Sequence, residues 1–440
     1  MTNPSPKNLQ QKNNGSKKKI FIWSLFDFAN TSYSIVIVTF LFAVYFKQVI
    51  ASGESIGDFY WSLGTSISML ITAIVSPVLG AIADYSAGKK RFLLFFTLLC
   101  IAATGLLYFA GQGDILYALI LFILANIGFE AGLVFYDAFL PELTTPKNYG
   151  RVSGYGFAMG YVGSLVSLAI ALPFIQAELI KETFPLSALF FLVFATPLFL
   201  FLKDNRKEVT RTESYFSIGF KRVMFTIGHL KNYKNLAMFL LAFFFYIEGV
   251  NTVIFFSGNY ASTTLGFSME ELIIFFIIVQ TTAIGGSVLF GIISDSIGQK
   301  KSINISLVIW VCTIAFAYFT SDPENEFVKL LAGFFSSDGI TIQRDSFYAV
   351  GLLAGSVMGA TQSTSRSLMS KLTPDDKKTE FFGFYSFFGK SSAILGPLVF
   401  GVVSYITDSQ RLAILTIAIF FIIGMIVLTK VKDPSKVVQN

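Results

Sequence analysis

Twelve long apolar stretches constrain this chain more than any other feature of its sequence. Each has about the 20 residues that a helix needs to cross the hydrocarbon core of a bilayer. The stretches show no period-two alternation, and an open sheet edge in lipid would leave backbone groups unpaired, so we expect helices rather than strands. They lie near residues 21–49, 59–83, 92–110, 115–140, 152–174, 184–202, 235–258, 269–293, 302–320, 346–370, 381–405 and 411–430. The sequence therefore predicts an all-α membrane protein with twelve transmembrane helices.

The composition supports this fold class. Of the 440 residues, 54% are hydrophobic and 14% are charged, whereas about a quarter of the residues of a soluble domain are charged. A surface that faces water on all sides cannot be built from this composition. We expect the lipid bilayer to be the protein's surroundings.

The distribution of Lys and Arg predicts the orientation, because basic loops resist translocation across a membrane. Of the 33 basic residues, 26 fall on the side that carries both termini, and five fall on the opposite side. We therefore expect a multi-pass protein of the cell (inner) membrane with both termini in the cytoplasm. The net charge of +6 is explained by these loops and requires no nucleic-acid partner.

The chain contains two similar halves. The sequence Gly-Ala-Ile-Ala-Asp-Tyr-Ser-Ala-Gly-Lys-Lys at 80–90 is echoed by Gly-Ile-Ile-Ser-Asp-Ser-Ile-Gly-Gln-Lys-Lys at 291–301. Repeats of this kind support two six-helix bundles around a central site. The expected divisions are an N-terminal tail (1–20), a first bundle (21–202), a cytoplasmic linker (203–234), a second bundle (235–431) and a C-terminal tail (432–440).

The repeated loop resembles the signature loop of the major facilitator superfamily, a fold of twelve transmembrane helices. The residues that match its pattern are Gly80, Asp84 and Gly88 in the first copy and Gly291, Asp295 and Gly298 in the second. The first copy departs from the pattern by one extra residue before Gly88 and by Tyr85 where an Arg is usual.

Within that superfamily the chain resembles the autophagy-type vacuolar amino-acid effluxers and their bacterial relatives. The matching stretches lie in both halves, at 23–33, 135–143, 150–161, 362–367 and 380–397. The resemblance implies efflux of amino acids. The chain departs from the family at 321–345, an acidic insertion on the expected outer side, and we expect its residues 327–335 to form a short interfacial helix.

Polar residues recur on the first and fourth helices of each half. Ionisable groups in a membrane helix are expensive and usually face a cavity. In the first helix, Asp27, Asn30 and Thr31 share one helical face, and Glu248, Asn251 and Thr252 repeat this spacing in the seventh. In the fourth helix Asn126, Glu130 and Asp137 form a stripe, and in the tenth Gln362 and Arg366 follow two glycines. These helices line the central cavity in the superfamily.

We expect the polar set to serve substrate or proton binding, with Glu130 and Glu248 as its deepest members. The candidates are Asp27, Asn30, Thr31, Asn126, Glu130, Glu248, Asn251 and Gln362. The alternative is that these groups only pair with one another and hold helices together. Asp27 lies near the cytoplasmic end, where it can instead cap or pair at the interface.

Three further charges lie toward the cytoplasmic side and are gate candidates. Aligning the halves at an offset of 229 residues brings Asp137 to Arg366, which suggests a switchable ion pair, and Lys390 lies nearby in the eleventh helix. The alternative is that each charge pairs within its own half, Arg366 with Asp375, Asp376 or Glu380.

Enzyme chemistry and metal binding find no support in the sequence. A Gly-x-Ser-x-Gly pattern at 53–57 falls in an external loop without a preceding strand, and the only histidine, His229, lies in the linker. No phosphate loop of the Walker type is present, so ATP-driven transport by this chain is not expected. We expect no metal and no cofactor.

The sequence favours a secondary transporter, active as a monomer, that works by alternating access on a small polar solute, with protons as a possible coupling ion. One alternative keeps transport and changes the solute to a sugar, a peptide or a drug. Another is a membrane sensor or assembly protein that keeps the fold and does not transport.

Overall fold

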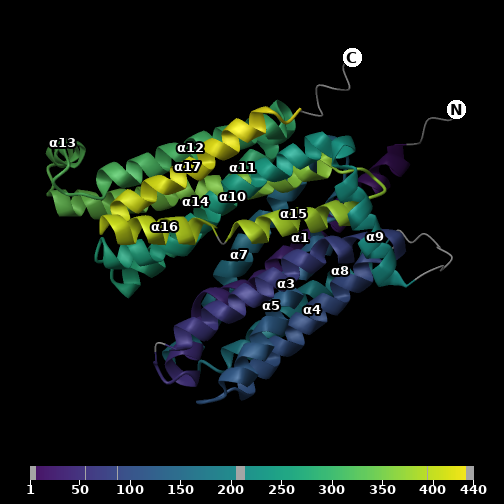
Figure 1. Ribbon diagram of the computed structural model, residues 1–440, viewed down its shortest axis with the longest axis horizontal. Coiled ribbons are helices and arrows are strands. Elements are labelled where there is room, and N and C mark those ends of the chain that lie inside the picture. The colour runs from purple at the N-terminus through teal and green to yellow at the C-terminus, as the bar shows by residue number, and fades with distance from the viewer. Residues whose placement is uncertain (1–5, 55, 87, 205–213, 394, 433–440) are drawn as a thin grey trace. The chain divides into compact units, whose positions relative to one another are not determined.

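The structure is a computed structural model and describes residues 6–54, 56–86, 88–204, 214–393 and 395–432. Every regular element in these ranges is a helix, as the apolar stretches predict (Figure 1). In chain order they are α1 (Pro6–Tyr33), η1 (Ser34–Phe40), α2 (Leu41–Tyr45), η2 (Phe46–Ile50), α3 (Ile56–Ser86), α4 (Lys89–Leu106), η3 (Leu107–Phe109), α5 (Ile115–Asp137), α6 (Leu140–Leu143), η4 (Pro146–Asn148), α7 (Tyr149–Gln176), α8 (Thr183–Phe201), α9 (Tyr215–Gly228), η5 (Leu230–Tyr233), α10 (Lys234–Thr263), α11 (Met269–Ile297), α12 (Gln299–Thr320), α13 (Glu326–Phe335), α14 (Gly339–Leu372), α15 (Lys378–Ser392), α16 (Leu395–Thr407) and α17 (Gln410–Thr429).

Ten helical segments in the described residues are long and apolar enough to cross a membrane. They coincide with ten of the twelve expected stretches. The stretch expected at 346–370 lies within α14, which has 34 residues and is rich in small and polar side chains. The twelfth stretch, 381–405, is divided between α15 and α16.

The prediction of one continuous helix over 381–405 is wrong. Helix α15 ends at Ser392 and α16 begins at Leu395. The sequence that follows the break is Gly396-Pro397. Proline lacks a backbone N–H and disfavours helical geometry in the residue before it, so a helix begins more readily here than it continues. The break leaves the start of a helix inside a stretch that was expected to cross the membrane.

The first expected helix also departs from regular geometry. It continues from α1 through two π-helical segments, η1 and η2, to Ile50. Short π segments insert extra residues into an α-helix and often mark functional positions. The segment still spans the apolar stretch as a whole, since residues 17–50 form one of the ten candidate crossings.

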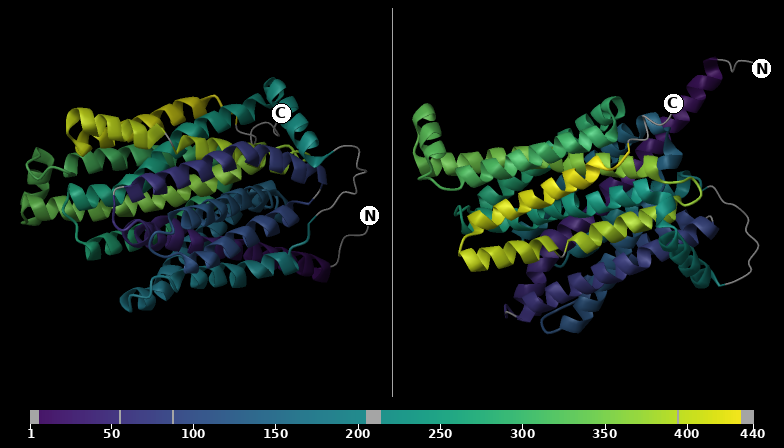
Figure 2. Two further views of the ribbon diagram at one scale, coloured as in Figure 1. Left: turned by 60° about the horizontal axis from the view of Figure 1, so that its bottom comes forward. Right: turned by 45° about the horizontal axis from the view of Figure 1, so that its top comes forward.

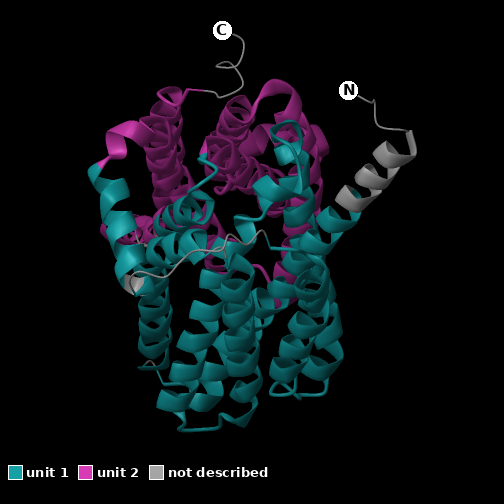
Figure 3. Ribbon diagram, turned by 90° about the vertical axis from the view of Figure 1, so that its right-hand side faces the viewer, with its two compact units in different colours: residues 1–228, 373–387 teal, residues 229–372, 388–440 magenta. Residues whose placement is uncertain are grey.

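The chain divides into two compact units (Figure 3). Unit 1 comprises residues 1–228 and 373–387, and unit 2 comprises residues 229–372 and 388–440. The first unit therefore includes the linker helix α9 and the first part of α15, although 373–387 follows α14 along the chain. The long helices within each unit lie side by side along their lengths (Figure 2).

Glycines allow close packing of helices within each unit. In unit 2, a Cβ on Gly355 would meet the Val279 carbonyl and one on Gly359 would meet the Ala283 carbonyl, so α14 lies directly against the backbone of α11. In unit 1, a Cβ on Gly160 would lie 3.4 Å from the Thr31 side chain, where α7 packs on α1. Small residues at helix interfaces permit this approach.

The acidic insertion forms the short helix that the sequence predicts. Helix α13 spans Glu326–Phe335, and the Asn325 side chain caps it by accepting a hydrogen bond from the Phe327 N–H at 2.9 Å. Leu330 and Phe334 are 69% and 80% exposed. An apolar helix face left uncovered in this way is suited to the membrane interface.

Candidate functional site

Helix α5 contributes a buried polar cluster to unit 1. The Asn126 amide donates to Ser68 Oγ of α3 at 2.8 Å, and the Tyr33 hydroxyl of α1 donates to Asn126 Oδ1 at 3.4 Å. Glu130 lies one helical turn further along α5 and is 5% exposed. Three helices of unit 1 thus converge on polar groups near a buried carboxyl. A carboxyl at such a position can carry a proton or bind a cationic group.

The polar face predicted for α1 is also buried. Asn30 donates to Asp27 Oδ1 at 3.5 Å, and both side chains are under 10% exposed. Thr31 is half-buried and donates to the Gly160 carbonyl of α7 at 2.9 Å. These contacts join α1 to α7, so Thr31 contributes to helix packing in this structure.

In unit 2, Glu248 of α10 reaches the break between α15 and α16. Its side chain is fully buried, and Oε1 accepts a short hydrogen bond from the backbone N–H of Gly396. The Thr252 hydroxyl donates to the Glu248 carbonyl at 2.8 Å and lies 3.4 Å from Oε1. Asn251 donates to Ser392 Oγ at 3.5 Å. The predicted Glu248, Asn251 and Thr252 set therefore surrounds the start of α16.

An apolar cavity of about 80 Å³ lies within unit 2, between α10, α11, α12, α14, α16 and α17. Aromatic side chains form much of its wall, and Ser257 and Tyr260 are its polar members. The lining side chains include Phe256, Phe275, Trp310, Phe347, Met358 and Phe400. A cavity of this kind can accept the apolar part of a small ligand.

Sequence reasoning missed the polar pairs that flank this region of unit 2. Tyr246 Oη and Ser365 Oγ lie 2.7 Å apart, and Trp310 Nε1 donates to Thr361 Oγ1 at 3.1 Å. A Tyr or Trp in an apolar stretch gives no signal by itself, because such residues also face lipid. The predicted Arg366 lies on the same helix, α14, and is 2% exposed, while Gln362 is half-buried.

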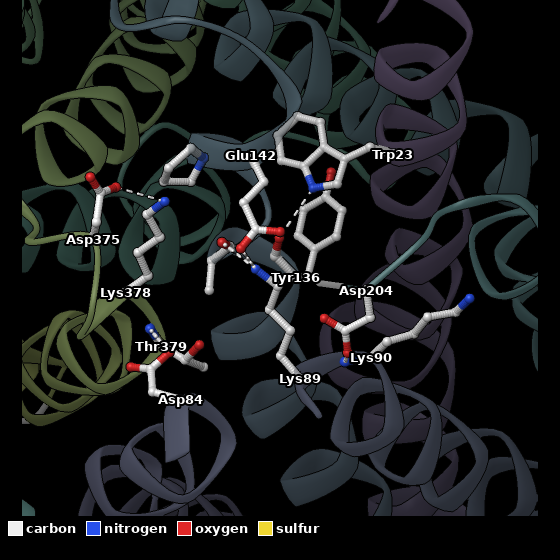
Figure 4. Close-up of polar contacts among 12 residues, drawn as sticks. Trp23, Asp84, Lys89, Lys90, Tyr136, Glu142, Asp204, Asp375, Lys378 and Thr379 are labelled. Atoms are coloured by element: carbon white, nitrogen blue, oxygen red, sulfur yellow. Dashed lines mark hydrogen bonds and ion pairs between the residues drawn. The ribbon is translucent and has the colours of Figure 1, made fainter. Parts of the chain in front are cut away.

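A second cluster lies at the end of unit 1 that carries α9, which we call the linker end. Asp84, near the end of α3, accepts a hydrogen bond from the backbone N–H of Thr379 at 3.0 Å (Figure 4). It accepts a second from the backbone N–H of Glu380 at 2.8 Å. The carboxylate therefore caps the N-terminus of α15. Gly80 lies one turn before Asp84, and a Cβ there would collide with the Thr379 carbonyl. The first signature copy thus positions the start of α15.

The lysines of the same loop are held within unit 1. Lys89 is 6% exposed and forms an ion pair with Glu142 (Figure 4). It also donates to the Ala138 carbonyl at 3.2 Å and lies over the Phe139 ring. Lys90 donates from its backbone N–H to Asp204 at 3.0 Å. Gly88 precedes α4 as its N-cap residue.

Linker helix α9 is part of this cluster, which the sequence did not predict. Glu380 is fully buried and accepts a short hydrogen bond from Thr226 of α9, and its Oε2 lies 3.7 Å from the Arg222 Nε. Lys377 donates to Thr226 Oγ1 at 2.7 Å. Beside it, Lys378 lies 2.8 Å from Asp375, and this hydrogen bond lowers the pKa of the Asp375 carboxyl below its usual value.

The second signature copy shapes the turn between α11 and α12. Gly298 has φ = +93°, a backbone conformation that favours glycine, and both helices meet there. Gly291 is buried and Asp295 is half-buried. The gate candidates Asp137, the last residue of α5, and Lys390 of α15 are also half-buried. His229 is exposed next to the linker helix.

Comparison with known proteins places the chain in a family. The family described as "Vacuole effluxer Atg22 like" matches residues 60–439. The chain belongs to this Atg22-like family. Its members in the comparison include an uncharacterized MFS-type transporter, YxiO, of Bacillus subtilis (strain 168), which is 33% identical over 428 residues and 94% of each chain. Autophagy-related protein 22 of Kluyveromyces lactis is 24% identical over 392 residues, covering 82% of this chain and 77% of the yeast protein.

Solved structures agree on the fold. The human organic anion transporter MFSD10 (TETRAN) aligns with a TM-score of 0.70 at 13% identity, covering 94% of this Atg22-like chain and 99% of the human protein. The proton:xylose symporter XylE aligns with a TM-score of 0.70 at 14% identity, covering 96% and 97% of the two chains. These structures show the major facilitator fold. The family match and the similarity to the Bacillus subtilis transporter show a multi-pass membrane transporter of a small molecule and not an enzyme.

Proposed function

We propose that this transporter exports amino acids or similar small polar solutes by alternating access, coupled to protons. The family description as vacuole effluxers supports efflux. The observation that carries the proposal is Glu248, a fully buried carboxyl at a broken helix and one turn from a cavity. A buried carboxyl in a membrane protein is costly without a functional role, and proton transfer or binding of a substrate ammonium supplies one.

Each unit by itself holds a buried polar cluster that supports the proposal. In unit 1, Asn126 and Glu130 lie on α5, the fourth expected helix of the first half, and in unit 2, Glu248 and Asn251 lie on α10, the first expected helix of the second half. Discontinuous helices are a recurrent feature of substrate sites in secondary transporters. Because proteins of one fold act on many different substrates, we base the proposed solute on the family and on the polar groups, and not on the fold.

Transport by the purified protein in proteoliposomes tests this function. We expect labelled amino acids to move across the membrane and the rate to change with an imposed pH gradient. Glu130→Gln and Glu248→Gln keep the shape of the side chains and remove the charge, so each should reduce transport and its pH dependence. Glu54→Gln, an exposed residue, is the control. Normal transport by both Gln variants would exclude the carboxyls from the mechanism.

The same assay distinguishes the alternative functions. Transport of sugars, peptides or drugs in place of amino acids would keep the transporter and change its solute. Binding without any movement would favour a sensor or assembly protein. We further propose that the protein works as a monomer in the cell (inner) membrane.

We also propose that both termini and the linker at 203–234 lie in the cytoplasm, on the charge asymmetry of the loops. A single cysteine placed at His229, which is exposed, tests this in a variant that lacks Cys100 and Cys312. An impermeant maleimide should label it only after the membrane is opened. Labelling in intact cells would show that the topology is the reverse of the one proposed.

A further inference from the structure

The start of α16 is an anion-binding position that the fold creates within unit 2. A helix begins with backbone N–H groups that have no partner in the helix, and its dipole favours negative charge there. Two residues separate the end of α15 at Ser392 from the start of α16 at Leu395, and α16 has 13 residues. The Glu248 carboxylate occupies this position through the Gly396 N–H.

The sequence at the helix start keeps room for a carboxylate. A Cβ on Gly396 would collide with Thr252 Oγ1 and with Glu248 Oε1, so any larger residue would fill the cradle. The Thr252 hydroxyl stands beside it at 3.4 Å from Oε1. The cradle thus presents a backbone donor and a hydroxyl to one carboxylate oxygen.

The other carboxyl oxygen of Glu248, Oε2, differs from Oε1 in its hydrogen bonding. Oε2 is buried and has no hydrogen-bond partner among the described residues. A buried polar atom without a partner costs roughly 1–3 kcal/mol and more when charged. The carboxylate is therefore held at the cradle by one oxygen, which makes it exchangeable for another carboxylate.

The cavity begins one helical turn beyond this contact on both helices. Four residues after Thr252 is Phe256, and four residues after Gly396 is Phe400. These two rings stack with centroids 4.0 Å apart, and both line the cavity. A ligand with its carboxylate at Gly396 would have an apolar body directed along the faces that form the cavity wall.

We propose that the N-terminus of α16 is the site for the carboxylate of the transported solute, and that Glu248 is an internal occupant which this carboxylate displaces. The ligand class is a monocarboxylate with a compact apolar body, which includes amino acids with apolar side chains. This inference rests on the proposed transport function and adds the group that the protein recognises.

Displacement also provides a reason for proton coupling. A Glu248 carboxylate that gives up the Gly396 N–H loses its backbone donor, and uptake of a proton from water removes the cost of an unpaired buried charge. Entry of one solute carboxylate therefore adds one proton to the Glu248 carboxyl. Several charged residues lie on the elements of unit 2 packed around α10: Lys231 on η5, Glu270, Glu271 and Asp295 on α11, Arg344, Asp345, Arg366 and Lys371 on α14, Lys390 on α15 and Arg411 on α17. Of these, Arg344 pairs with Glu271, and Arg411 pairs with Asp322 at 2.7 Å.

Chemical rescue of the full-length protein tests the site without transport. Glu248→Ala empties the cradle, so acetate at pH 7 should raise the melting temperature of this variant by about 3 °C or more in a saturable manner. Acetamide, which has a similar shape and no charge, should not do so. Glu130→Ala removes a buried carboxyl that lies at no helix start, so acetate should leave it unchanged, as it should the unmodified protein.

A failure of acetate to stabilise Glu248→Ala beyond Glu130→Ala would overturn the proposal. If Glu248→Ala does not fold, Glu248→Gln is tested with 4-methylpentanoate instead. The neutral Gln side chain can leave the cradle without first taking up a proton, so the added carboxylate displaces it more easily. This ligand should stabilise Glu248→Gln more than the unmodified protein, and 4-methylpentanamide should not. Equal stabilisation of both proteins by 4-methylpentanoate would refute displacement. Loss of transport in proteoliposomes with intact rescue would instead count against the proposed function alone.

Discussion

The Asp84 carboxylate accepts a hydrogen bond from the backbone N–H of Glu380 at 2.8 Å, across 296 residues of the chain. The same carboxylate accepts a hydrogen bond from Thr379, so one side chain of α3 satisfies two backbone donors at the start of α15. Gly80 permits the approach, since any Cβ at this position would meet Thr379. The first signature loop therefore holds a segment that belongs, by sequence, to the second half.

Weakening this cap should loosen the start of α15. Asp84→Asn removes the charge and offers only one acceptor, and loss of a cap costs about 1 kcal/mol. A cysteine placed at Thr379, which is 1% exposed, should then react about 5- to 10-fold faster with a water-soluble maleimide. Asp58→Asn, which breaks an exposed ion pair with Lys47 elsewhere in the same helix, is the control. Equal rates in the two variants would exclude a capping role.

The buried Glu380 carboxyl depends on Thr226 of α9. Thr226→Val keeps the side-chain shape and removes the donor to Glu380 and the acceptor for Lys377. An unsatisfied buried group costs about 1–3 kcal/mol, so the amides of α9 should exchange with solvent roughly 5- to 100-fold faster. Hydrogen-exchange mass spectrometry measures this. The control is Thr196→Val, because the Thr196 hydroxyl bonds only within its own exposed helix turn; hydrogen exchange in α9 should not change in this variant. If exchange in α9 is also unchanged in Thr226→Val, the Thr226 contact does not hold α9.

The fold was predictable where local pattern decides it. Apolar length alone gave the positions of the ten candidate crossings in the described residues, because the bilayer fixes how many residues a helix needs. The apolar run at 327–335 in the insertion predicted α13. The break after Ser392 was missed, because Gly396 and Pro397 lie in a run whose hydrophobicity continues across them.

The candidate sites were only partly predictable. Depth in an apolar stretch identified Glu130 and Glu248, since burial of a carboxyl is expensive in any fold. Nothing local indicates that Glu248 meets Gly396, 148 residues away, or that Glu380 meets Thr226. Helix α9 was assigned to a linker because residues 203–234 are rich in Lys, Arg and polar residues, and only its packing on α3 gives it a role.

A gate pair between Asp137 and Arg366 remains a prediction from the repeat. Residues related by the repeat lie at equal depth, and opposite charges there can pair when one side of the carrier closes. Removal of one partner of a buried pair costs about 3–5 kcal/mol, so each single change should abolish most transport and bias the carrier toward inward opening. Asp137→Arg combined with Arg366→Asp should restore it in proteoliposomes. If the double variant stays inactive, each charge pairs within its own half.

Two adjacent glycines of α11 provide a matched test of close helix packing in unit 2. A Cβ on Gly286 would collide with the Ser356 carbonyl of α14, whereas one on Gly285 would meet nothing within 4 Å. Because a backbone carbonyl cannot turn aside as a side chain can, Gly286→Ala should force the helices apart at a cost of about 1–3 kcal/mol. Gly285→Ala should be neutral or slightly stabilising, since alanine favours the helix. Thermal unfolding of the two variants in the same detergent measures the difference. Equal melting temperatures would mean that α11 and α14 do not pack this closely.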